Sequence, residues 1–183
     1  VNGFQSFSLL VQAIHRIERV LKAVGAKDVA TYWKLNAGRS AMRLDALEAW
    51  DAANLDIVLC PPHATAPLRH GDSADFSAAG SYAMRYNLLN FPAGVVPVTK
   101  ARADDGVRAN PRDRIEHVAA SVEKGSAGLP IGVQVVGRPF MEHKVLAAMI
   151  AIESAAISQM RVTTSTGGPV KYDMFKSVPE WGA

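Results

Sequence analysis

Residues 82–98 read YAMRYNLLNFPAGVVPV, and the pattern of apolar residues changes half-way along this stretch. Before Phe91, methionine and leucine side chains recur at the spacing of one helix face. From Val95 onward, valines follow one another without a charged residue, which is typical of a core strand. Pro92 and Gly94 separate the two patterns. The stretch therefore predicts a helix, a tight turn and a buried strand in succession.

The regions around this stretch predict an α/β fold in which helices and strands alternate. Asp28 offers an N-terminal cap for a helix over residues 29–54, whose apolar line includes Tyr32, Leu35, Leu44, Leu47 and Trp50. The apolar run 57–60 ends at two prolines, as expected for a short strand buried on both faces. Residues 129–136 predict a core strand that turns into a helix starting near Phe140. Strands separated by helices favour a layered architecture.

Three further segments complete the predicted organisation. Residues 4–24 place apolar side chains at spacings of three and four, which predicts an amphipathic helix that ends at Gly25 and forms a hairpin with the next helix. Residues 99–127 mix charged and small residues, so we expect a solvent-facing insertion with one helix. We expect one domain over residues 1–161 and a polar tail over residues 162–183.

The composition limits the classes of function. A hydrophobic share of 49% in 183 residues supplies a core for one domain. The net charge of only +3 is dispersed, so we expect no nucleic-acid partner. The sequence has no long apolar run for a membrane span, and neither a leader nor an initial methionine precedes Val1, so we expect a truncated chain. The single Cys60 excludes an internal disulfide and suits the cytoplasm.

The histidines do not form the pattern of a metal site. His63, His70 and Asp72 are the only cluster, and they lack the paired spacing of zinc ligands. Ser81 could be combined with His63 and Asp72 into a catalytic triad, but no Gly-x-Ser-x-Gly elbow supports such a triad. We therefore expect neither a metal nor another cofactor, and we reject this triad.

Four stretches occur in the order in which a known family has them. They are YWKL at 32–35, NLDIVLCPP at 54–62, residues 82–98, and GLPIGVQVV at 128–136. Together they resemble the C-terminal part of amidase signature hydrolases, in particular the fatty-acid amide hydrolase branch, over residues 4–155. The resemblance implies the C-terminal portion of an α/β fold whose mixed, twisted central sheet is covered by helices.

The resemblance also implies where catalysis takes place. The family's serine nucleophile, its second serine on a cis peptide and its lysine base all lie upstream of the matched region. The small-residue strings at 38–40 and 80–82 lack the glycine framing of the nucleophile segment. We therefore expect no catalytic residue in this chain, which would be inactive without the missing N-terminal amidase portion.

The substrate-binding residues are likewise implied by the resemblance. In the family, the helix before the turn lines the channel for the acyl chain, which assigns Ser77, Gly80 and Met84 to the channel wall. Ile115 and Val20 are carried over as further contacts. The implied partner is a long-chain amide, although helical spacing alone would make Met84 ordinary core filling.

Residues 4–28 correspond to a hydrophobic cap that contacts membranes in the resembled branch. The anchors implied here are Phe4, Phe7, Leu10 and Val11, with basic residues available to anionic headgroups. The alternative is a plain amphipathic helix that packs on the core. The resemblance thus implies a cytoplasmic protein with peripheral membrane association, and it leaves a homodimer open.

Other functions stay open. One alternative is a small-amide hydrolase, or the amidase subunit that feeds ammonia to tRNA-dependent transamidation. Another is a noncatalytic binding module. The amino-acid sequence of residues 82–98 favours the long-chain enzyme over these alternatives.

Overall fold

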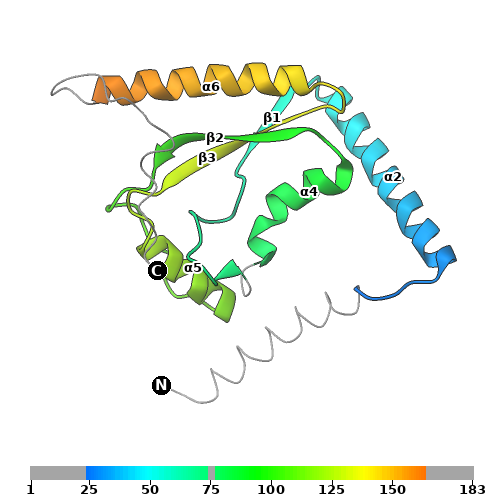
Figure 1. Cartoon of the computed structure of the whole chain (residues 1–183), viewed down its shortest axis with the longest axis horizontal. Helices are drawn as coiled ribbons and strands as arrows, with labels where there is room; N and C mark the ends of the chain where they lie inside the picture. Colours follow the sequence, from blue (N-terminus) through cyan, green and yellow to red (C-terminus); the bar gives the residue numbers. More distant parts are fainter. Residues whose placement is uncertain (1–23, 74–76, 164–183) are drawn as a thin grey trace, which may run out of the picture.

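The computed structural model of the protein describes residues 24–73 and 77–163 (Figure 1). The predicted helix over residues 4–24, its hairpin with the next helix and the polar tail beyond residue 163 lie outside the described residues. In chain order, the elements are α2 (Val29–Ala52), β1 (Ile57–Cys60), the 3₁₀ helix η1 (Ser77–Gly80), α4 (Ser81–Leu89), β2 (Ala93–Lys100), α5 (Arg114–Lys124), β3 (Pro130–Gly137) and α6 (Glu142–Thr163).

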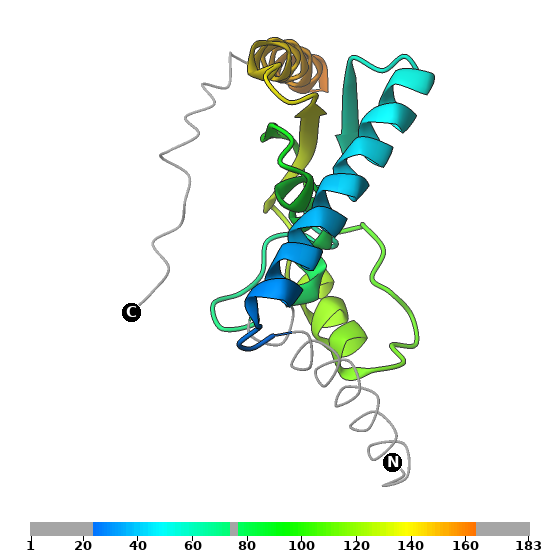
Figure 2. The same ribbon diagram turned by 90° about the vertical axis from the view of Figure 1, so that its right-hand side faces the viewer.

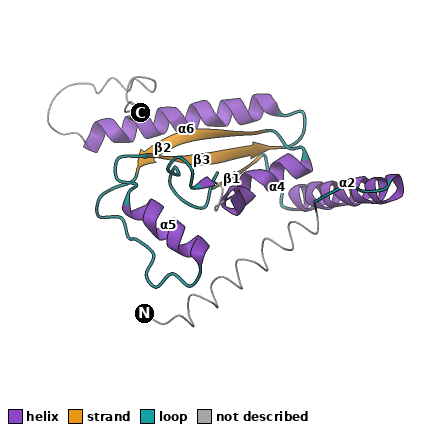
Figure 3. Ribbon diagram, turned by 60° about the horizontal axis from the view of Figure 1, so that its bottom comes forward, coloured by secondary structure: helices purple, strands orange, loops and turns teal. Residues whose placement is uncertain are grey.

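The three described strands form one sheet in the order β1-β3-β2, with α6 on one face and α4 on the other (Figures 1 and 3). Val136 of the central strand β3 pairs with Val58 of β1 and with Ala93 of β2. The α/β class is confirmed. Both pairings are antiparallel, however, whereas a mixed sheet was expected.

Strand β1 departs from its prediction. Its bounds agree with the predicted 57–60, but Leu59 is 53% exposed. The expectation of a strand buried on both faces is wrong because β1 lies at the edge of the sheet and only Val58 and Cys60 pack against the core. An apolar run identifies a strand but does not say how many neighbours cover it.

Helix α2 begins as predicted. The carboxylate of Asp28 accepts a hydrogen bond from the backbone N–H of Thr31 at 2.7 Å, which satisfies a free donor of the first turn. At the other end, the indole Nε1 of buried Trp50 donates to the carbonyl of Leu55 at 2.5 Å. Trp50 also meets Phe91 edge to face, with ring centroids 5.7 Å apart. The end of α2 is thereby fixed against the turn after α4.

The predicted helix and turn around Phe91 are confirmed, and a strand follows them, but of that strand only Val96 is buried. Asn90 ends α4 in the left-handed conformation with φ 58°, and the N–H of Phe91 donates to the carbonyl of Tyr86 at 3.0 Å. Phe91 is buried, and β2 follows from Ala93. The valines of β2 alternate, since Val96 is buried while Val95 is 47% exposed.

Helix α6 starts two residues later than predicted. Phe140 has φ 64°, which excludes it from a right-handed helix, so α6 begins at Glu142. The helix then lies close to the sheet. A Cβ atom at Gly137 would come 2.6 Å from Cγ2 of Val145, so only glycine permits this approach.

The segment between β2 and β3 contains one helix, α5, as predicted. Residues 102–110 are exposed, but α5 buries Ala119 and Val122. Ala119 and Ala79 form a second, smaller core with partly buried neighbours. The loop 102–110 is therefore solvent-facing, whereas α5 is buried on one side and exposed on the other.

Candidate functional site

Helix α4 has two faces of opposite character. Leu89 is buried, and Tyr86 packs with it in the core cluster that contains Val136. Met84 and Leu88, one turn apart, are 53% and 46% exposed. Because 3.6 residues complete a turn, these two lie on a different face from Tyr86 and Leu89. One face of α4 thus holds it on the sheet, and the other presents apolar side chains outward.

The structure brings two of the predicted substrate-binding residues together. Gly80 is the N-cap of α4, and a Cβ atom there would lie 3.8 Å from the terminal Cε of Met84. Met84 therefore extends over the space that a larger residue at position 80 would occupy. Ser77 begins η1, which leads directly into α4. The predicted contact Val20 lies outside the described residues.

Ile115 belongs to a neighbouring environment. It lies in the first turn of α5 and packs, half-buried, on the small core of Ala79 and Ala119. Ala79 of η1 immediately precedes Gly80, so Ile115 of α5 packs next to the predicted channel residues. Ile115 packs against the inner side of this element.

A polar cluster beneath α4 was missed from the sequence. Gln134 of β3 is only 3% exposed, and its Nε2 donates to Sγ of Cys60 at 3.3 Å. Burial, together with the neighbouring Cys60 thiol and its hydrogen bond, raises the pKa of the Tyr86 hydroxyl. The Tyr86 hydroxyl therefore stays uncharged at neutral pH. The one available signal was a lone polar residue in the apolar strand GLPIGVQVV.

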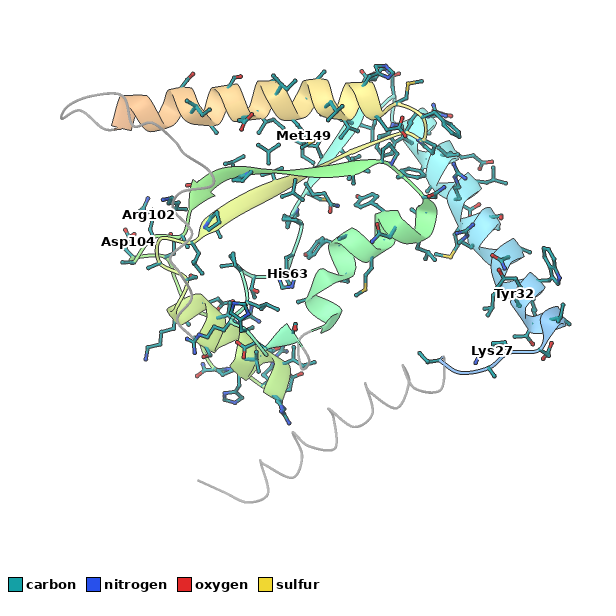
Figure 4. The ribbon with its side chains drawn as sticks, in the orientation of Figure 1. Lys27, Tyr32, His63, Arg102, Asp104 and Met149 are labelled. Carbon is teal, nitrogen blue, oxygen red and sulfur yellow. The ribbon has the colours of Figure 1, made fainter. Side chains whose placement is uncertain are left out.

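The loop between β1 and η1 carries the predicted histidine cluster. Figure 4 shows His63 on the α4 side of the sheet. Its Nδ1 lies 3.3 Å from the backbone N of Thr65, and the N–H of Ala64 donates to the carbonyl of Ala79 at 3.1 Å. These bonds hold the loop against η1. Within residues 24–73 and 77–163, no group of three or more acidic, histidine or cysteine side chains has the geometry of a metal site.

Two ion pairs join the end of α2 to the start of α6. Arg138 pairs with Asp51, and Nζ of Lys144 donates to Asp56 at 2.6 Å. The hydrogen bond from Lys144 lowers the pKa of Asp56. These residues line a polar pocket of about 260 Å³, but each base there already has an acid as its partner. The two ion pairs connect the end of α2 to the start of α6, and among the described residues no unpaired charged side chain lines this pocket to bind a ligand.

Comparison with known proteins decides the family. A sequence model of the Amidase family matches residues 7–146. The chain belongs to the amidase family. The resemblance predicted from the sequence is therefore confirmed.

Individual relatives support this amidase assignment. The chain is 31% identical over 158 residues to Fatty-acid amide hydrolase 1 of Sus scrofa, covering 84% of this chain and 27% of that protein. It is 28% identical over 138 residues to an Acetamidase of Emericella nidulans, covering 69% and 24%. A solved structure of a Fatty acid amide hydrolase superposes with a TM-score of 0.60 at 22% identity, covering 71% of this chain and 24% of that one. The chain thus spans about a quarter of the length of these relatives.

The helices were also compared with the requirements of a bilayer. No helix in the described part of the chain is both long and apolar enough to cross a membrane.

Proposed function

We propose that this chain forms the C-terminal, substrate-channel part of a serine amidase that hydrolyses fatty acyl amides to acid and amine. The proposal rests on one observation above the others. Met84 of α4, a flexible apolar side chain, is 53% exposed among the described residues, and its Cε lies near Gly80, where a Cβ atom would be 3.8 Å away. A flexible thioether beside a residue without a side chain can adapt to an aliphatic chain.

Such a face suits an aliphatic chain. Each methylene group that leaves water for an apolar wall contributes about 0.8 kcal/mol. A channel that covers several methylenes therefore discriminates long from short substrates by several kcal/mol without touching the scissile bond. Ser77, at the start of η1, and Ile115 of α5, which packs on Ala79, are the further proposed contacts of the substrate. The contribution of this chain is then selectivity.

The chemistry in this proposal lies outside the chain. A serine, activated by a relay through a second serine to a lysine, attacks the amide carbonyl carbon and gives its proton to the departing amine. Backbone N–H groups stabilise the oxyanion. Water then attacks the acyl-serine ester, releases the fatty acid and restores the serine hydroxyl. None of these catalytic groups comes from this chain, which would not turn over substrate alone.

A second candidate function is hydrolysis of small amides. It is supported by the 28% identity with an Acetamidase, which is close to the 31% identity with Fatty-acid amide hydrolase 1. In that enzyme, the outward face of α4 would be covered by protein and not by substrate. The two candidates therefore differ in what contacts Met84.

Reconstitution separates these functions. The chain is assayed on oleamide and on acetamide, with and without the rest of an amidase domain. We expect turnover only when both parts are present, with oleamide preferred. Preference for acetamide would support the second candidate. Turnover by the chain alone would refute the assignment of catalysis to the remaining portion.

We further propose that the protein is cytoplasmic and contacts membranes peripherally through Phe4, Phe7, Leu10 and Val11, which lie outside the described residues. The Phe7→Asp/Leu10→Asp double variant should co-sediment less with anionic liposomes, because it removes apolar anchors and adds negative charge. The same two substitutions at Phe140 and Leu146, exposed elsewhere, serve as the matched control. Unchanged sedimentation of the first variant would leave residues 4–24 as a packing helix.

A further inference from the structure

A groove of about 280 Å³ runs between α2 and the end of α4; Leu88 of the outward face of α4 lines it, and Met84 does not. Helix α2 supplies Arg39, Ser40, Arg43, Leu44 and Leu47 to its lining. The last residues of α4 supply two leucines, with Asn90 beyond them. Figure 2 shows α2 running obliquely past the sheet with one long side uncovered by other described elements. The groove is thus basic at one end and apolar along the rest.

Arg43 has an unusual position in this groove. Its Nε is buried and lacks a hydrogen-bond partner in the described residues. Arg108 and Arg112, by contrast, pair with Glu123 and Glu116. A guanidinium donor that has lost water and gained no acceptor is costly, and a carboxylate is the acceptor whose two oxygens match its fork.

The surroundings of the groove also lack a cover. Leu44 and Leu88, both in the lining, are 60% and 46% exposed. Arg39 lies one helical turn before Arg43 and adds a second guanidinium on the same side. A carboxylate flanked by apolar groups would satisfy both the charge and the leucines.

We infer that this groove seats an acidic side chain, with apolar neighbours, from the part of the amidase domain that lies outside this chain; this inference rests on the proposed function. The relatives have about three quarters of their length outside the matched region, which is ample polypeptide to cover the groove. A two-fold contact between two copies of the groove is disfavoured, since it would bring four guanidinium groups together.

The test measures association between this chain and the remaining amidase portion. Arg43→Met keeps the apolar stem and removes the guanidinium, so the dissociation constant should rise by about tenfold to a hundredfold. Lys34→Met is the matched control. Position 34 is nine residues away, which at 100° per residue places it on the opposite side of α2, and its variant should bind within about twofold of the unsubstituted chain. Arg43→Lys should fall between the two.

A charge exchange identifies the partner group. Arg43→Glu should abolish association, and one Asp→Arg or Glu→Arg substitution in the remaining portion should restore it. Oleate, added as a free carboxylate, should leave the association unchanged. If oleate displaces the remaining portion, the groove is a fatty-acid site and the inference is overturned. The inference is also overturned if the Arg43→Met variant associates normally and its complex hydrolyses amides. Failure of the unsubstituted chain to associate would instead overturn the proposed function.

Discussion

Helices α6 and α2 belong to one chain but relate to the sheet in different ways. Helix α6 lies along β2 and β3, with Val145 and Val135 4% and 0% exposed between them (Figures 1 and 3). Helix α2 meets the core only near Trp50, and its earlier part extends away with Tyr32 58% exposed (Figure 1). The outward face of α6 also exposes Leu146 and Ile150, at 57% and 64%. The sheet thus covers the inner face of α6 within the chain, whereas the described residues leave the earlier part of α2 without a cover.

The largest expected effect tests the closed part of this comparison. Val135 is fully buried between the sheet and α6, so Val135→Asp would place a carboxylate there without a partner. We expect the free energy of unfolding of the complete amidase to fall by about 3 kcal/mol or more. Denaturant titration measures this change. Leu146→Asp, on the outward side of α6 at 57% exposure, should change it by no more than about 0.5 kcal/mol. Equal decreases in the free energy of unfolding for the two variants would contradict the difference between the buried and the outward position.

The smallest expected effect concerns α5, whose charges are satisfied within the chain. Hydrogen bonds from Arg112 lower the pKa of Glu116 from 4.5 to about 2. Because the pKa is lowered in the folded state, this pair stabilises α5 above pH 4.5, and the stabilisation is lost as the pH falls toward 2. Arg112→Met should return the pKa toward 4.5, as followed by the carboxyl carbon in NMR titration. If the pKa of Glu116 stays near 2 in the Arg112→Met variant, the N-terminal end of α5 lowers this pKa, and not Arg112.

Local chemistry explains which parts of the fold could be predicted. The cap at Asp28 and the turn around Phe91 depend on residues within a few positions of one another, and both are confirmed. The start of α6 was predicted near Phe140 and lies at Glu142, because Phe140 adopts a left-handed conformation. The residue type alone does not indicate this conformation. The apolar line of α2 could be read from the sequence, but not that Tyr32 and Leu44 on this line are exposed. The periodicity of apolar residues identifies one face of a helix but does not say what packs against that face.

The candidate site was predicted in a different way. Gly80 and Met84 came from the family resemblance, because their spacing alone is also that of a buried helix face. The exposure of Met84 could not be read from the sequence, since it depends on how α4 is seated on the sheet. Gln134 and the orphan Nε of Arg43 were missed for the same reason, because their partners lie far away in sequence or outside the chain.

The most direct test of the central claim is the Michaelis constant of a Met84→Trp variant of the complete amidase. An indole that displaces about two methylenes from the channel should raise the constant for oleamide by roughly tenfold or more, and that for acetamide by less than about twofold. Tyr82→Trp, which adds bulk about 200° around α4, should change neither. Equal changes for both substrates in Met84→Trp would contradict the account.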